Sequence, residues 1–96
     1  MIHPVTFTTP HQQATVSVRF THPFRSHLTA SIFCSFEPLE QRAFIDELDR
    51  LFFIERIFKP HKGEARIFLS LPLDADREEV LSTIEDIFTE YVTDNY

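Results

Sequence analysis

Apolar and polar residues alternate through much of the first third of this chain, and this pattern predicts β-strands. In residues 14–21 every second side chain is apolar, so one face of the strand points to a core while the other carries hydroxyls and an arginine. Residues 5–9 alternate in the same way, and residues 10–13, which begin with proline, predict a hairpin turn between the two strands. A third strand is expected over residues 28–36.

A helix is expected after this third strand. It should begin at Glu37 and Pro38, because proline at the first helical position loses only an N–H that has no helical partner there. Its apolar residues recur at helical spacing up to Phe52 or Phe53, where the helix should end. The apolar positions of this helix are Leu39, Phe44, Leu48, Leu51 and Phe52.

A second helix is expected at the end of the chain. It should begin at Asp74 or Asp76, since a short acidic side chain can accept hydrogen bonds from the free N–H groups of the first turn. Its apolar stripe continues with helical spacing and consists of Val80, Leu81, Ile84, Ile87, Phe88, Tyr91 and Val92.

Two further strands, residues 54–59 and 65–71, lie between the helices. They flank residues 60–63, which include the only glycine of the chain, and glycine tolerates the positive φ that tight hairpin turns require. The resulting order, β-β-β-α-β-β-α, predicts an α+β two-layer sandwich with two helices on one face of a five-stranded antiparallel sheet. With 96 residues, the chain is expected to form a single α+β domain over residues 1–96.

Charge is distributed unevenly along the chain. Residues 74–96 hold eight carboxylates and a single base, Arg77, whereas residues 1–36 contain no aspartate or glutamate. At about 100° per residue, three of these acids share the side of the last helix opposite its apolar stripe. They are Glu79, Asp86 and Glu90, which we call the acidic ridge. The ridge is either a solvated face that keeps the protein soluble or a docking surface for a basic protein.

The sheet face turned away from the predicted helices has a different chemistry. Alternation places Arg19, Phe33, Arg66 and Phe68 on this face among serines and threonines. Aromatic rings beside arginines on an open sheet suit base stacking, but a phosphate backbone would be repelled by a chain of net charge −6. A protein partner or a sheet-mediated homodimer is therefore favoured over nucleic acid, and burial of both rings under the loop of residues 22–27 is the other alternative.

The residue types that commonly carry catalysis form no recognised motif. Cys34 is the single cysteine and lies on an apolar strand face, which predicts a buried thiol and excludes an intramolecular disulfide. The histidines lack zinc-site spacing, and neither GxSxG nor a P-loop occurs. We predict a protein that is not an enzyme and that needs no metal or other cofactor. The absence of a signal peptide and of a long apolar run predicts a cytoplasmic location without membrane attachment.

The order of elements and the acidity resemble the class I type III secretion chaperones. These are small, acidic, cytoplasmic α/β dimers that hold an unfolded secretion substrate, and they begin with a helix that has no counterpart in this sequence. The resemblance implies a homodimeric chaperone or scaffold, which is one functional hypothesis. The other comes from the charge pattern: a small acidic inhibitor, escort or adaptor of a basic partner. Its most specific form is an inhibitor of a nucleic-acid-binding machine, of the kind that mobile elements encode.

Overall fold

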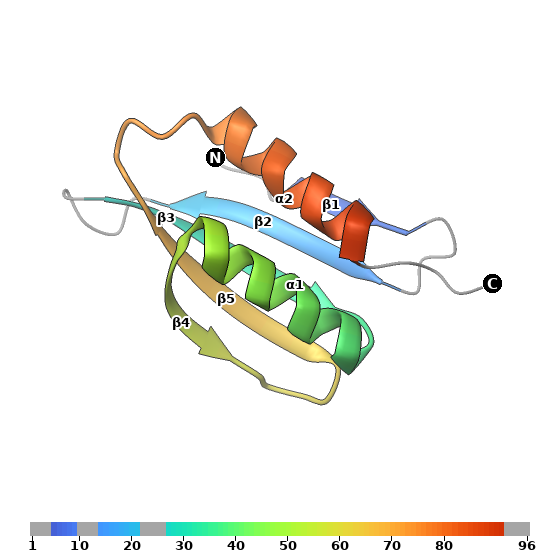
Figure 1. Ribbon diagram of the computed structural model, residues 1–96. Helices are drawn as coiled ribbons and strands as arrows, with labels where there is room; N and C mark the ends of the chain where they lie inside the picture. The colour runs from blue at the N-terminus through green and yellow to red at the C-terminus, as the bar shows by residue number, and fades with distance from the viewer. Residues whose placement is uncertain (1–4, 10–13, 22–26, 92–96) are drawn as a thin grey trace.

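A computed structural model of the chain describes residues 5–9, 14–21 and 27–91. These residues form five strands and two helices in the predicted order (Figure 1). The elements are β1 (Val5–Thr8), β2 (Thr15–Thr21), β3 (Leu28–Ser35), α1 (Pro38–Leu51), β4 (Phe53–Phe58), β5 (Glu64–Leu71) and α2 (Arg77–Tyr91). The predicted α+β fold is confirmed.

The strands form one antiparallel sheet in the order β1-β2-β3-β5-β4. Strand β3 is central, and β1 and β4 are the two edges. Both helices lie on the same side of the sheet, with α1 over the half that contains β5 and β4 and α2 over β2 (Figure 1). The other side of the sheet is not covered by any described element.

Strict alternation gives the sheet its buried face. The register aligns Val16 with Cys34 and Ile32 with Ile67, so the apolar residues of neighbouring strands point together toward the helices. Against them α1 places Phe44 and Leu48, and the Phe44 ring meets Phe36 edge to face at 5.5 Å between centroids. These side chains belong to one continuous core.

Two residues assigned to the apolar stripe of the first helix lie outside this core. Leu39 is 76% exposed and Leu51 is 45% exposed. Leu39 lies five residues before Phe44, which rotates it by about 140° from the buried direction. Leu51 is the last residue of α1, beyond the part of the helix that packs on the sheet. Gln41, three residues before Phe44, is buried instead.

The helix starts follow the expected chemistry. At α2, the Asp76 carboxylate accepts hydrogen bonds from the N–H groups of Glu78 (3.0 Å) and Glu79 (3.3 Å), so Asp76, and not Asp74, is the capping residue. At α1, the Glu37 carboxylate accepts a hydrogen bond from the N–H of Leu39. The predicted stripe residue Val92 lies outside the described residues.

The hairpin between β4 and β5 contains the glycine that the sequence assigned to a turn. Gly63 has φ +82°, a conformation that residues with a Cβ rarely adopt. Its carbonyl oxygen accepts a hydrogen bond of 2.9 Å from the N–H of Phe36, which ties the turn to the end of β3.

Strand β4 contains a β-bulge that was not predicted from the sequence. Ile54 pairs with Leu69 and Arg56 with Phe68, so Glu55 is an extra residue in the ladder, a β-bulge. Beyond the bulge the alternation is inverted. As a result Ile54 and Ile57 both face α1, while Arg56 lies on the open face of the sheet.

Replacing Phe44 by alanine should destabilise the protein far more than replacing Leu39. Phe44 is fully buried, so Phe44→Ala removes a ring and leaves a cavity, which lowers the free energy of unfolding by about 3–5 kcal/mol. Leu39→Ala, the matched control at an exposed site, should change it by less than about 0.5 kcal/mol. Urea denaturation followed by circular dichroism measures both values, and similar losses in the two variants would contradict the described packing of α1.

Candidate functional site

The two sides of the molecule carry different charge. Helices α1 and α2 contain nine carboxylates and three arginines, a net charge of −6, which equals the net charge of the whole chain. The five strands contain three arginines and two glutamates, a net charge of +1. Because both helices lie on one face of the sheet, the excess of acid is confined to one side, which we call the helical side (Figure 1).

The acidic ridge lies on the outer surface of α2. Glu79, Asp86 and Glu90 are all exposed, and with a rise of 1.5 Å per residue they span about 16 Å along the helix. Within residues 5–9, 14–21 and 27–91, none of the three carboxylates makes an ion pair. The structure therefore brings the predicted ridge residues together on a solvated surface.

The ends of the two helices show how strongly acids accumulate on the helical side. Glu47 forms an ion pair with Arg50, and the hydrogen bond from Arg50 lowers the pKa of the Glu47 carboxyl. The negative charges of Glu47 and, next, Glu90 raise the pKa of Tyr91. At Tyr91 the two carboxylates outweigh Arg50, whose charge acts in the opposite direction.

The open face of the sheet carries a cluster of aromatic and arginine side chains. In one row across the sheet, Phe33 on β3 pairs with Arg66 on β5, which pairs with Phe58 on β4. In the next row, Phe68 on β5 pairs with Arg56 on β4, so aromatic and arginine side chains are neighbours in both rows. We call these five residues the aromatic–arginine cluster. Predicted residues Phe33, Arg66 and Phe68 are thus adjacent.

The arginines of this cluster lie over the rings. The guanidinium carbon of Arg66 is 5.2 Å from the Phe33 centroid, and that of Arg56 is 5.2 Å from Phe68 and 5.3 Å from Phe58. Phe58 and Phe68 contact each other edge to face at 5.9 Å. These are cation–π distances, so each guanidinium interacts with at least one ring.

Arg19, the fourth residue predicted on this face, lies beside the cluster. With Arg66, Phe33 and two serines it lines a shallow hollow of about 230 Å³. The hollow presents two guanidinium groups and two hydroxyls, a set of donors that suits a carboxylate or phosphate group. The alternative prediction was that the loop of residues 22–27 buries the rings of Phe33 and Phe68. Residues 22–26 of this loop lie outside the described residues.

Three of the five cluster residues, Phe33, Arg66 and Phe68, were predicted on this face. Arg56 and Phe58 were not, because no faces were assigned to the β4 segment. Arg56 and Phe58 reach the open face because of the bulge at Glu55, whereas Phe53, which precedes the bulge, lies on that face without it. One signal could have revealed this. Ile54 and Ile57 are three residues apart, and a regular strand cannot turn both toward a core.

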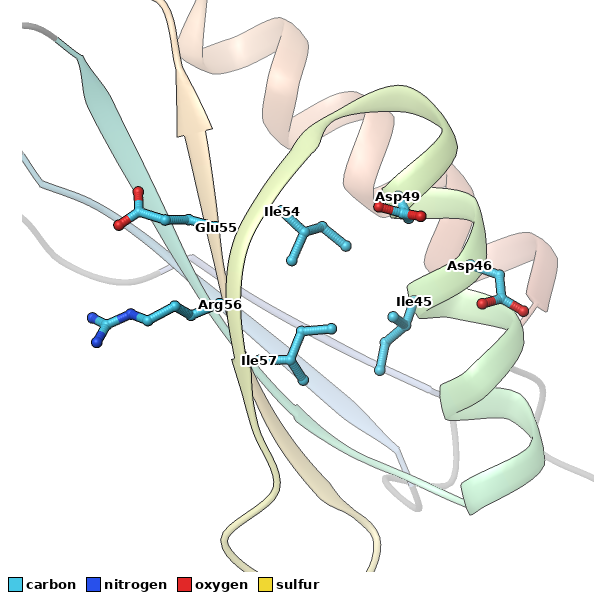
Figure 2. Close-up of a pocket in the computed structure, with 7 residues that line it drawn as sticks. All are labelled: Ile45, Asp46, Asp49, Ile54, Glu55, Arg56 and Ile57. Carbon is cyan, nitrogen blue, oxygen red and sulfur yellow. The ribbon is translucent and has the colours of Figure 1, made fainter.

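A groove separates α1 from β4, shown in Figure 2. Its volume is about 480 Å³, and Ile45 from α1 and Ile54 and Ile57 from β4 point into it. Asp46 and Asp49 stand on the helical rim (Figure 2). This groove could not be predicted from the sequence pattern, because it depends on the bulge and on the curvature of an edge strand.

The remaining side chains of β4 near the groove turn the other way. Glu55 and Arg56 extend away from α1 (Figure 2), and the Glu55 carboxylate lies 3.6 Å from Nε2 of His27. The groove therefore has an apolar floor and an acidic rim, and its lining includes no base that points into it.

No cluster that could hold a metal ion was found in the part of the chain that the structure describes. Neither of the two helices is long and apolar enough to cross a membrane. The chain matches no known protein family, and searches of curated proteins and of solved structures found no significant match.

Cys34 should make the stability of the protein fall at alkaline pH. Burial in the core raises the pKa of its thiol to about 12, whereas the thiol of the unfolded chain ionises near pH 9. Above about pH 9 the unfolded state thus loses a proton that the native state keeps, and the free energy of unfolding decreases by up to about 1.4 kcal/mol per pH unit until about pH 12.

The comparison is between the native protein and the Cys34→Ala variant, which lacks the thiol but keeps every other titrating group. Urea denaturation at about pH 8 and about pH 10 should show a loss that is larger by about 1.4 kcal/mol in the native protein. An identical pH dependence in both proteins would mean that the thiol is not buried in the native state.

Proposed function

We propose that this protein binds a basic partner protein without catalysing a reaction, and that it acts on this partner as an inhibitor, escort or adaptor. The observation that carries the proposal is the confinement of the whole net charge, −6, to the helical side. A surface of one sign attracts oppositely charged molecules and speeds their association.

The state of the ridge carboxylates supports this proposal. They are exposed and make no ion pair among the described residues, so a partner does not have to displace an internal base to reach them. A single exposed ion pair contributes only about 0.2–1 kcal/mol. Three carboxylates along one helix can therefore contribute useful affinity only together, against a partner with several cations at matching spacing.

A partner with such a surface is typically a protein that binds nucleic acid, since proteins that contact phosphates expose clustered lysine and arginine. An acidic protein that occupies this cluster would compete with nucleic acid for it. Inhibition of a nucleic-acid-binding machine is the most specific form of the proposal, and it requires only a surface, not a catalytic site.

Charge reversal of the ridge should abolish partner binding. The triple variant Glu79→Lys, Asp86→Lys, Glu90→Lys replaces attraction by repulsion at three positions, and we expect the affinity to fall by more than about tenfold. Tagged protein is used to capture partners from cells of the native source, the captured proteins are identified by mass spectrometry, and binding of the purified partner is then measured by calorimetry at about 0.05 M and about 0.3 M salt.

A second triple variant controls for net charge. Asp74→Lys, Glu78→Lys, Glu85→Lys changes the charge by the same amount at exposed positions outside the ridge. This variant should retain most of the affinity. The proposal is wrong if the ridge variant captures the same proteins with the same affinity, or if the captured proteins have no basic surface.

A second function is favoured by the open face of the sheet. Phe58, a member of the aromatic–arginine cluster, is 48% exposed, and Phe53, which lies on the same face, is 69% exposed. Phenylalanine and arginine are enriched at the centres of protein interfaces, and a contiguous apolar patch on an uncovered sheet is typical of one. We infer a homodimeric scaffold, joined through this face, as the alternative function.

The homodimer has its own test. In analytical ultracentrifugation the native protein should sediment as a dimer, and the double variant Phe33→Asp, Phe68→Asp should sediment as a monomer, because carboxylates in the interface would be desolvated without a partner. Phe58→Asp, at a more exposed ring, provides a variant with less risk to folding. A native protein that sediments as a monomer at all concentrations rules this function out.

A further inference from the structure

Strand β4 is an edge of the sheet with an exposed apolar surface. It pairs only with β5, and among residues 5–9, 14–21 and 27–91 no further backbone hydrogen bond reaches its outer side. Ile57 is 40% exposed, and Phe53 and Phe58 are more exposed still. Long apolar edges pair readily with other chains, and natural proteins normally protect them.

The protection of this edge is incomplete. The bulge at Glu55 interrupts the ladder early in β4, but residues 56–58 pair regularly with β5 after it. The backbone groups on the other side of these residues therefore have the spacing that an added strand requires. The edge also borders the groove of about 480 Å³ described above, so an added strand would find space for its side chains (Figure 2).

The geometry of strand addition defines what could bind. A sixth strand would lie about 4.8 Å beyond β4, with every second side chain pointing to the helical side. Those side chains would meet Ile45, Ile54 and Ile57 first and the carboxylates of Asp46 and Asp49 at the rim. The site thus suits isoleucine, leucine or valine at alternate positions, followed by lysine or arginine.

We propose that the α1–β4 groove binds an extended segment of the partner protein, which adds to β4 as a sixth strand and places its basic side chains against Asp46 and Asp49. This inference rests on the proposed function, because it names a part of the basic partner and the place where it docks. Charge complementarity favours this occupant, because Asp46 and Asp49 stand at the rim and no base of the lining points into the groove. A second copy of the chain would bring Ile57 and Lys59, but a continuous antiparallel sheet would also bring its own acidic helix α1 to the same side.

In this mode of binding, main-chain hydrogen bonds would provide affinity and side-chain contacts in the groove would provide specificity. Main-chain hydrogen bonds to β4 are independent of sequence, so they would hold any extended segment. The groove selects apolar side chains at alternate positions, and the two carboxylates select a basic residue at one end. A segment with acidic residues at this end would face like charges and would be rejected.

The test uses a synthetic peptide of about nine residues in which threonine alternates first with isoleucine and then with lysine. Titration into isotopically labelled protein at about 0.15 M salt should shift the amide signals of residues 53–58 and of α1 near Asp46 and Asp49. It should also slow hydrogen exchange of the β4 amides. A peptide of the same composition, with isoleucine and lysine placed on opposite faces, is the control and should bind at least about tenfold more weakly.

Variants separate the groove from the ridge. Asp46→Lys with Asp49→Lys changes two exposed side chains and should weaken peptide binding by about tenfold, while Glu78→Lys with Glu85→Lys, the matched charge control on α2, should change it by less than about twofold. Ile57→Lys places a charge in the groove itself and should abolish binding; its amide spectrum shows whether the fold is kept.

Four results would overturn the inference. The first is peptide-induced shifts confined to the open face or the ridge, and the second is equal binding of both peptides. The third is a native protein whose β4 amides are protected by self-association before peptide is added, because then a second copy occupies the edge. If the groove variants bind the captured basic partner as tightly as the native protein and only the ridge variant fails, this inference is wrong while the proposed function stands.

Discussion

The packing of α1 and α2 on a single face of the sheet is the constraint from which the other features follow. The apolar residues of β2, β3 and β5 alternate strictly, and the two helices bury that set, with Phe44 and Leu48 at the centre. Two helices cannot also cover the opposite face, so the polar half of the same alternation is left uncovered. Burial on one side and the availability of a binding surface on the other therefore have the same physical cause.

This constraint also explains how much could be predicted from the sequence. Periods of 2 and 3.6 determine which residues face a core, so the order of the five strands and two helices was predicted, and residues such as Glu79 and Phe33 were placed on the correct faces. The pattern does not determine a bulge, because a bulge is defined by how a strand pairs with its neighbour, where two residues lie opposite one. The faces of Arg56 and Phe58, and with them the full aromatic–arginine cluster and the groove, depended on that single residue, Glu55.

The helical side and the two apolar surfaces act over different distances. The field of the net charge of −6 extends about 8 Å at physiological ionic strength, and in the proposed function it would affect chiefly how fast a basic partner arrives. The groove and the cluster would act only on contact, where burial of isoleucine and phenylalanine would determine how long a bound partner stays. An acidic helix layer next to an apolar edge strand is therefore a reasonable arrangement for a small protein that has room for one core and no deep pocket.

The edge strand β4 connects these surfaces, because its residues face both sides of the sheet. Ile54 and Ile57 form the floor of the groove, and Phe53, Arg56 and Phe58 lie on the open face. Any chain that pairs with β4 must follow the same alternation, so every second side chain of that chain would stand beside Phe58 and Phe53 while the others enter the groove. A strand added at this edge would thus enlarge the open face at the same time as it fills the groove. The groove and the outer part of the open face, formed by Phe53, Arg56 and Phe58, thus share one edge, and a strand that pairs with that edge would contact both.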